Sequence, residues 1–585
     1  MEIMRVAVAQ FATSLNIQEN LATCIRMINE AATCKPSLIV LPEFCNTQPC
    51  YTDHNQAWQQ ALTLKGDFLQ SIAEQAKAHA CHIALNVTLR REPSRDHQEG
   101  TTKSNISITS CLFSPLGELI QQANKQSLTE DEQCFFSASG SLSEEVTTPC
   151  EKLGLLAGSD IMTFDAARNL AADGVVLLCH SMSTFALDQS HIHGPARACE
   201  NKVFIATASK VGPLISPEHI SQPQNIMYAA KPLSPHKDLI GIGQSQIISP
   251  DGKVLAKIDN TEEGYIFADI DFTKTDSKKT ASRPDGTNLI KQRRPELYQT
   301  QPMEKLPLHG DTKNIPATSN VAIFATYTTN EQAIEDVCHY IENNLTDITQ
   351  LPELFFIADK ETLQNAKQMT EAAQLSKELV KQVSAVLRPF QYVCTSLIIE
   401  GKHQAVLINK DGLFATQQQL HFCNRYRWST LGDSVNTIEL PLEQGSIKVA
   451  MLTADDANIP EIFNTGAFNS IHVLLVPFDI QEPAEVEYSL LSRAVENRIC
   501  IVAATREKKF TAEAPTESKN KKKIKPQKST GLIINLTTDD ALLTQWKSRK
   551  FDGYINPPLI KHQHGKITKA VIHPIAACHK LYQGS

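Results

Sequence analysis

The 585-residue sequence has no hydrophobic run long enough to cross a bilayer. Apolar stretches such as Gly174–Cys179 and Ile471–Phe478 have the length of strands, whereas a spanning helix needs about 20 apolar residues. The N-terminus shows no basic segment followed by an apolar one. These features predict a soluble, cytoplasmic chain that does not associate with membranes.

Paired cysteines and phosphate-binding motifs are also missing. The 15 cysteines are scattered without a CxxC pair, which predicts reduced and mostly buried thiols. No histidine or cysteine cluster has metal-ligand spacing, and no GxGxxG, P-loop or nucleic-acid-binding module is found. The sequence therefore predicts no metal and no cofactor. Its net charge of −8 gives no general attraction to nucleic acid.

What the sequence does contain is an alternation of short β-branched runs with stretches of helical period. Arg5–Gln10 precedes the helical stretch Gln18–Cys34, and the apolar run Leu38–Leu41 follows. This alternation predicts the α/β class, with helices packed on sheets. Because the apolar runs do not alternate with polar residues, we expect sheets that are covered on both faces.

The sequence also repeats itself. RACENKVFIA at Arg197–Ala206 returns as RAVENRICIVA at Arg493–Ala503, 296 positions later. LGLLAGSD at Leu153–Asp160 and VAMLTADD at Val449–Asp456 are separated by the same 296 positions. The tripeptide LPE occurs at Leu41–Glu43 and Leu351–Glu353, 310 positions apart, a difference that loop insertions explain. A fixed spacing of this kind predicts a duplication.

The two halves are joined by a polar segment. Gln299–Ser319 contains three prolines and shows no period, as a linker does. We therefore predict a first domain at residues 1–303, a linker at 304–319 and a second domain at 320–585.

The second half contains one low-complexity stretch at 508–529, with a lysine run at Lys519–Lys528. It lies between two strand-like segments, which favours a solvated loop insertion. A contact with nucleic acid or an anionic membrane is the alternative.

Taken in order, the landmarks of the first half resemble the carbon–nitrogen hydrolase (nitrilase) superfamily. Members of that family share a strand ending in glutamine, an LPE segment, an SPLGE hairpin, a catalytic lysine, a second glutamate before an aromatic pair, an RAxEN helix and a closing RRPELY. The corresponding segments here are Gln10, Leu41–Glu43, Ser114–Glu118, Lys125, Glu132, Arg197–Asn201 and Arg293–Tyr298. The resemblance implies an αββα sandwich for residues 1–300. It implies catalytic positions at Glu43, Lys125 and Glu132.

The family also uses a cysteine at a strand-to-helix elbow, and this residue is missing. The thiolate attacks an amide, nitrile or carbamoyl carbon, a glutamate takes the thiol proton, and the lysine stabilises the oxyanion. The matching stretch here is Gly154–Asp160, which places Gly158 at the nucleophile position. Loss of a covalent nucleophile costs on the order of a millionfold in turnover.

The second half resembles a diverged copy of the first. Its equivalents of Glu43, Lys125 and the nucleophile are Glu353, Gln419 and Ala454. We therefore expect tandem four-layer αββα domains. Pairing through the family's two-fold interface would give an eight-layer pseudo-dimer within one chain, and further homo-oligomerisation remains open.

The leading interpretation is a pseudoenzyme that binds a small amide, carbamoyl or carboxylate ligand, or serves as a regulatory or scaffold protein. The alternative is an active amidohydrolase or acyl-transfer enzyme. It would activate water through Glu43 and Lys125, or use a displaced nucleophile, Ser159 or Cys179. For Glu43 and Lys125 a purely structural role as a buried ion pair is an equal possibility. For Cys179 a buried structural thiol is the favoured interpretation.

Overall fold

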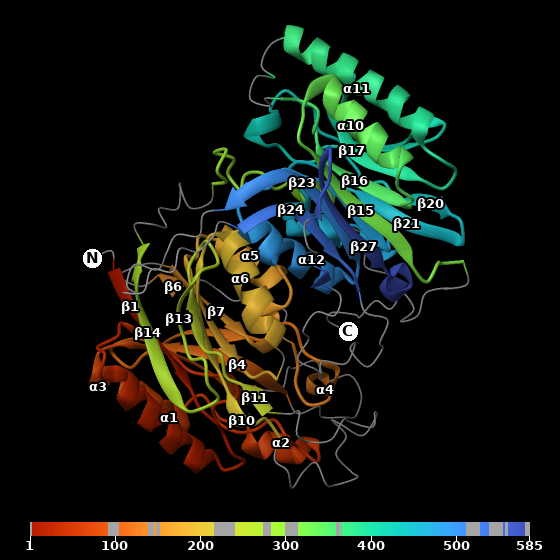
Figure 1. Ribbon diagram of the computed structural model, residues 1–585. Helices are drawn as coiled ribbons and strands as arrows, with labels where there is room; N and C mark the ends of the chain where they lie inside the picture. Colours follow the sequence, from red (N-terminus) through yellow and green to blue (C-terminus); the bar gives the residue numbers. More distant parts are fainter. Residues whose placement is uncertain are drawn as a thin grey trace. The chain divides into compact units, whose positions relative to one another are not determined.

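The computed structural model describes residues 3–91, 105–138, 146–147, 152–185, 187–215, 240–272, 282–298, 314–358, 363, 366–510, 527–536, 554–555 and 560–578. These residues form two compact units. Unit 1 is built from Met1–Ala281, and unit 2 from Ser282–Asp540 and Lys550–Leu581. In Figure 1 unit 1 runs from red to yellow-green and unit 2 from green to blue. The lysine run lies mostly outside the described residues.

Unit 1 contains two six-stranded sheets, with strand orders β14-β1-β2-β3-β4-β5 and β13-β12-β9-β8-β7-β6. The strands of the first sheet are β1 Ile3–Gln10, β2 Leu38–Val40, β3 His82–Arg90, β4 Ile106–Phe113, β5 Leu119–Asn124 and β14 Gly264–Asp271. Those of the second are β6 Val146–Thr147, β7 Lys152–Ala157, β8 Leu177–Met182, β9 Phe204–Ser209, β12 Gln246–Ile248 and β13 Val254–Lys257. A separate small pair consists of β10 Val211–Pro213 and β11 Ile240–Ile242.

Helices cover the outer faces of both sheets of unit 1. The helices are α1 Ile17–Ala32, α2 His54–Gln60, α3 Asp67–His79, α4 Glu130–Gln133, α5 Asp165–Ala172 and α6 Gly194–Asn201, with a 3-10 turn at Gly158–Ile161 and a π turn at Gln189–His193. The side chain of Asn16 caps α1 by accepting hydrogen bonds from the amides of Gln18 and Glu19.

Three apolar clusters define four layers in unit 1. One joins α1 and α3 to the first sheet, and one fills the space between the two sheets. The third joins the second sheet to α5 and α6. Figure 1 shows α1 and α3 lying along one side of the first sheet. The predicted α/β class and the αββα layering are confirmed, and the buried strands β2, β3 and β4 show why their sequences do not alternate.

Each sheet of unit 2 has the strand order of the matching sheet of unit 1, with β26 added at the edge of the first sheet. The two sheets run β19-β18-β17-β16-β15-β27-β26 and β20-β21-β22-β23-β24-β25. The first contains β15 Ser319–Thr326, β16 Ile348–Glu353, β17 Tyr392–Ile399, β18 Lys402–Asn409, β19 Gly412–Gln418, β26 Ile560–Lys561 and β27 Gly565–Ile572. The second contains β20 Ile438–Leu442, β21 Gly445–Met451, β22 Val473–Pro477, β23 Cys500–Phe510, β24 Gln527–Ile534 and β25 Tyr554–Ile555.

The helices of unit 2 are α9 Pro295–Tyr298, α10 Asn330–Glu342, α11 Ala366–Val386 and α12 Leu490–Asn497, with short 3-10 or π turns at Asn424–Tyr426, Asp456–Asn458, Pro460–Asn464, Gly466–Asn469, Glu485–Ser489 and Pro574–Cys578. Helices α10 and α11 pack on the first sheet. None of the described helices combines the length and apolarity needed to cross a membrane.

The division between the units differs from the boundary that the sequence predicts. Ser282–Tyr298 groups with unit 2, although the RRPELY motif within it was assigned to the first domain. The guanidinium of Arg283 explains this grouping, because it pairs with Asp455 at 3.1 Å and with Glu485 at 3.0 Å. All three side chains are at most 4% exposed. Contacts between residues so far apart leave no local pattern in the sequence, so the sequence did not predict this grouping.

Replacement of Arg283 by Met in the full chain should lower the free energy of unfolding by roughly 3 kcal/mol, because Asp455 and Glu485 stay buried with less counter-charge. Urea unfolding followed by circular dichroism measures this loss. The control is Lys410→Met, which breaks an exposed ion pair with Asp411 and should cost less than about 1 kcal/mol. Equal losses for the two variants would contradict the structural role of Arg283.

Candidate functional site

Gly158 lies at the point where β7 turns into a 3-10 helix. Its φ is +45°, a left-handed conformation that glycine adopts freely. A Cβ atom built on Gly158 would lie within 2.7 Å of both carboxylate oxygens of Glu43 and of Nζ of Lys125. The elbow therefore ends directly against these two side chains.

Three charged side chains meet at this elbow. Nζ of Lys125, just after β5, donates to Oε1 of Glu43 at 3.0 Å and to Oε1 of Glu132 at 2.6 Å. Glu43 follows β2, and Glu132 lies in α4. Glu132 is held in place because its Oε2 accepts the amide of Thr129 at 2.9 Å. Lys125, Glu43 and Glu132 are 3%, 1% and 7% exposed, so the cluster is shielded from water.

Burial and charge set the protonation of this cluster. Burial raises the pKa of Glu43 to about 7, and the neighbouring Lys125 only partly offsets that rise. Burial also disfavours the charged form of Lys125, but Glu132 and Glu43 outweigh it and raise the pKa of that ammonium. Lys125 is thus cationic at neutral pH, while Glu43 exchanges its proton near pH 7.

Asp160 and His180 hold the elbow in position. Oδ1 of Asp160 accepts the amides of Gln126 and Ser127 at 3.0 and 2.7 Å, which ties the turn to the segment that carries Lys125. Nε2 of His180 donates to the carbonyl of Gly158 at 3.0 Å. Burial lowers the pKa of His180 to about 4, so the ring is neutral and keeps this hydrogen bond at physiological pH.

Ser159 and Cys179 are directed away from the charged cluster. Oγ of Ser159 donates to the carbonyl of Ser127 at 2.5 Å. Cys179 lies in β8 and packs in the core between the two sheets, beside Leu155 and Ala206. Burial raises the pKa of the Cys179 thiol to about 12. The structure thus brings Glu43, Lys125, Glu132 and Gly158 together and leaves these two side chains in other surroundings.

A further lysine near Glu43 was not singled out from the sequence. Lys210 directly follows β9 and is 1% exposed. Its Nζ has no hydrogen-bond partner among the described residues and lies 5.6 Å from the centroid of the Phe44 ring. Nζ of Lys125 lies 6.0 Å from the same centroid. The available signal was a lysine at the carboxyl end of a buried strand, where ligand-binding residues of α/β sheets gather.

The corresponding positions of unit 2 form a hydrogen-bond network around Glu353. Glu353 is fully buried and accepts the Tyr426 hydroxyl at 2.5 Å and the Ala454 amide at 3.0 Å. Gln419 binds His403 Nδ1 at 3.0 Å. Ala454 has φ +53°, the counterpart of Gly158. At this elbow the Tyr426 hydroxyl bonds the glutamate, whereas in unit 1 the Lys125 ammonium does so.

One group of three potential metal ligands occurs among the described residues, Asp285, Cys423 and Asp455 in unit 2. The guanidinium of Arg425 already pairs with Asp285 at 3.0 Å and with Asp455 at 2.7 Å. Arg283 adds a second cation at 3.1 Å from Asp455. Because these carboxylates are neutralised by arginines, the group does not fit a divalent cation.

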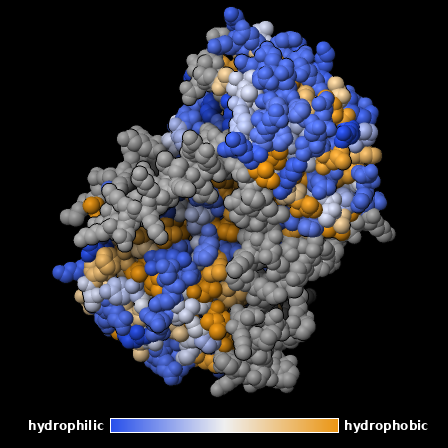
Figure 2. Space-filling view, in the orientation of Figure 1, coloured by the Kyte–Doolittle hydropathy of each residue, from blue (hydrophilic) through white to orange (hydrophobic). Residues whose placement is uncertain are grey.

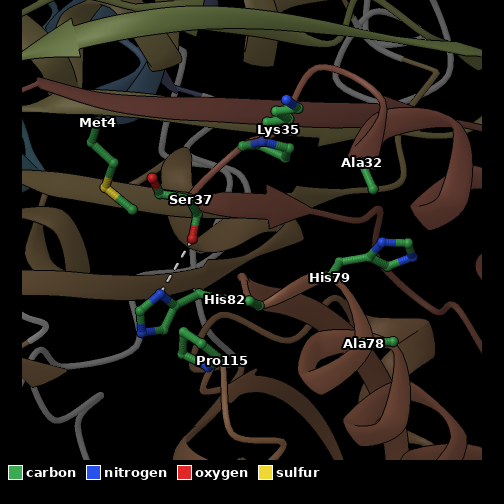
Figure 3. Close-up of a pocket in the computed structure, with 10 residues that line it drawn as sticks. Met4, Ala32, Lys35, Ser37, Ala78, His79, His82 and Pro115 are labelled. Carbon is green, nitrogen blue, oxygen red and sulfur yellow. Dashed lines mark hydrogen bonds between the residues drawn. The ribbon is translucent and has the colours of Figure 1, made fainter.

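A pocket of about 670 Å³ lies elsewhere in unit 1. Figure 3 shows it beside Met4, Ser37 and His82, with the ring of His82 donating to the carbonyl of Ser37 at 3.3 Å. These residues begin or precede β1, β2 and β3. Glu43 follows the opposite, carboxyl end of β2, so this pocket is separate from the charged cluster.

Unit 1 is an αββα domain with a buried glutamate–lysine–glutamate cluster at a strand-to-helix elbow. Residues 5–280 match the family model described as carbon-nitrogen hydrolase. Over this segment the chain resembles the carbon–nitrogen hydrolase (nitrilase) superfamily.

Individual proteins are similar to about half of this chain. The chloroplastic omega-amidase of Arabidopsis thaliana is 25% identical, with 52% of this chain and 75% of the relative covered. The deaminated glutathione amidase of Mus musculus is 24% identical, with 51% and 85% covered. A crystal structure of an amidase from Nesterenkonia sp. is 19% identical and covers 51% of this chain and 95% of its own, with a TM-score of 0.39.

Substitution of Gly158 by Ala should destabilise unit 1 more than the same change at another left-handed glycine. Gly174 has φ +95°, and a Cβ built there would meet nothing closer than Lys152 at 3.6 Å. Gly174→Ala should therefore cost about 1 kcal/mol of backbone strain. Gly158→Ala should cost roughly 1–3 kcal/mol more, because Glu43 and Lys125 must also move. Urea unfolding of both variants measures the difference, and equal costs would disprove this packing at the elbow.

Proposed function

We propose that the first domain, residues 1–303, binds a small amide, carbamoyl or carboxylate compound without forming a thioester. The domain would then act as a binding, regulatory or scaffold module. The observation that carries this proposal is the position of Gly158. The place where a family nucleophile would project is bounded by Glu43 and Lys125, and glycine supplies no atom that could attack a carbonyl carbon.

The retained side chains suit an amide as ligand. Lys125 is a cationic donor for the ligand's carbonyl oxygen. Glu43 in its ionised form accepts a hydrogen bond from an amide nitrogen, and in its protonated form it donates to a carboxylate oxygen. Relatives named omega-amidase and deaminated glutathione amidase are consistent with an amide ligand.

We further propose that residues 320–585 are a diverged copy of the first domain with a structural role. Both units share the order of their strands. They also share local detail, since Arg197 pairs with Glu200 and Arg493 pairs with Glu496 in the equivalent helices α6 and α12. In unit 2 Glu353 bonds the Tyr426 hydroxyl and the Ala454 amide, and Gln419 stands where unit 1 has Lys125, which supports a scaffold rather than a second ligand site of the same kind.

Binding of small amides to the full chain, measured by isothermal titration calorimetry, tests the proposal. Lys125→Met should weaken the binding of any amide that the wild type binds by about tenfold or more, because a charge-assisted hydrogen bond contributes roughly 1.5–3 kcal/mol. Lys152→Met is the matched control, since Lys152 begins β7, at the end opposite Gly158, and donates to the carbonyl of Asp173. Unchanged affinity in Lys125→Met would remove Lys125 from the ligand site.

The second candidate is an amidase in which water attacks the amide directly. It is favoured by Glu43, whose pKa of about 7 matches the task of a general base at neutral pH. Lys125 would stabilise the oxyanion. Displaced nucleophiles at Ser159 or Cys179 are less suited, because their side chains point elsewhere.

Ammonia release from a panel of amides distinguishes the two candidates. A water-attacking amidase should gain rate as pH rises through about 7, where Glu43 loses its proton, and Glu43→Gln should lower the rate by at least about a hundredfold. No ammonia from wild type, together with amide binding, supports the non-catalytic proposal. Gly158→Cys should be run alongside, and any activity gained there would show that only the nucleophile is missing.

A further inference from the structure

The glutamate–lysine–glutamate cluster carries one more negative than positive charge when its members are ionised. Glu43 and Glu132 both contact the single ammonium of Lys125. An unbalanced charge in a shielded site is costly, because burial removes the solvation that each carboxylate has in water. A second buried cation beside Glu43 would restore neutrality.

Lys210 is held next to Glu43 by the backbone. The amide of Lys210 donates to the carbonyl of Met182 at 3.2 Å, and the amide of Glu43 donates to the same oxygen at 3.5 Å. The residue after Glu43, Phe44, adopts φ +52°, and the ammonium groups of Lys125 and Lys210 lie 6.0 and 5.6 Å from the centroid of its ring. Two ammonium groups therefore approach Glu43 and its neighbours from different strands, one after β5 and one after β9.

We propose that Lys210 is a positioning residue of this site, the buried counter-charge that keeps Glu43 ionised beside Lys125 and Glu132. It acts through Glu43 and needs no contact with a ligand. The proposal deepens the proposed function, since Glu43 is the group whose charge selects the ligand. The titration of Glu43 itself can be followed in the ligand-free protein.

The groups around these side chains leave few other charges to consider. Glu43 faces Lys125, Glu132 and Lys210. Lys210 also faces Cys45, which follows β2, and Cys24 on α1. The contact with Cys45, together with burial, holds the pKa of Cys24 well above its usual range, so that thiol is neutral.

Asp160 and His180 face Lys125 from the elbow and from β8. His180 is neutral above about pH 4, and Asp160, whose pKa burial raises to about 6, is tied to two backbone amides. Burial lowers the pKa of Lys210 to about 8, so it is mostly cationic at pH 7 and loses its charge at higher pH.

The test follows the ionisation of Glu43 by carbon-13 NMR of protein labelled at the glutamate carboxyl groups. The Glu43→Gln variant assigns the signal. Lys210→Met should raise the titration midpoint of Glu43 by about one pH unit or more, because an opposite charge nearby lowers a carboxyl pKa by that amount. Lys210→Arg should restore most of the wild-type midpoint, and Lys152→Met should leave it unchanged.

Two results would overturn the proposal. One is an unchanged Glu43 midpoint in a folded Lys210→Met protein, and the other is an Arg variant that behaves like Met. Lys210→Gln provides a second neutral side chain in case the Met variant does not fold, with the same upward shift expected. If no amide binds, the proposed function fails while the Glu43 midpoint still decides the role of Lys210. If amides bind, the pH profile of their affinity should shift with that midpoint.

Discussion

At the elbow of unit 1, the ammonium of Lys125 is buried between two carboxylates, and this pairing constrains the surrounding strands. Its partners come from different parts of the fold, Glu43 after a central strand and Glu132 from a short helix. Removing one member of such a buried group leaves a charge without compensation, which typically costs 3–5 kcal/mol. The ends of β2, β5 and β7 must therefore converge, and this convergence is what places Gly158 against the cluster.

Unit 2 shows that the backbone frame does not depend on these charges. Gly158 and Ala454 both adopt a left-handed conformation at the end of the equivalent strands β7 and β21. In unit 2 the glutamate at this point is satisfied by the hydroxyl of Tyr426 and a backbone amide instead of a lysine. The sheet order fixes the elbow, and the side chains around it decide whether a lysine or a tyrosine bonds the buried glutamate.

Sequence patterns were sufficient for the frame and for part of the site. The period of Gln18–Cys34 predicted α1 at Ile17–Ala32, and the repeat spacing of 296 positions paired Gly158 with Ala454, which share their conformation. Two features were not predicted from the sequence. The signal for Lys210 was its place at the carboxyl end of a buried strand, which many residues share, so Lys210 was missed. The segment Ser282–Tyr298 was assigned by a motif to the first domain, whereas the ion pairs of Arg283 group it with unit 2.

Under the proposed function, the protonation state of Glu43 determines which class of ligand the site binds. A ligand next to Gly158 meets the Lys125 ammonium, which only donates hydrogen bonds, and the carboxyl group of Glu43. An amide offers one acceptor and one donor, so it satisfies both groups when Glu43 is ionised. A carboxylate offers acceptors only, so it fits when Glu43 carries its proton. With the pKa of Glu43 at about 7, the proposed site would favour amides above that pH and carboxylates below it.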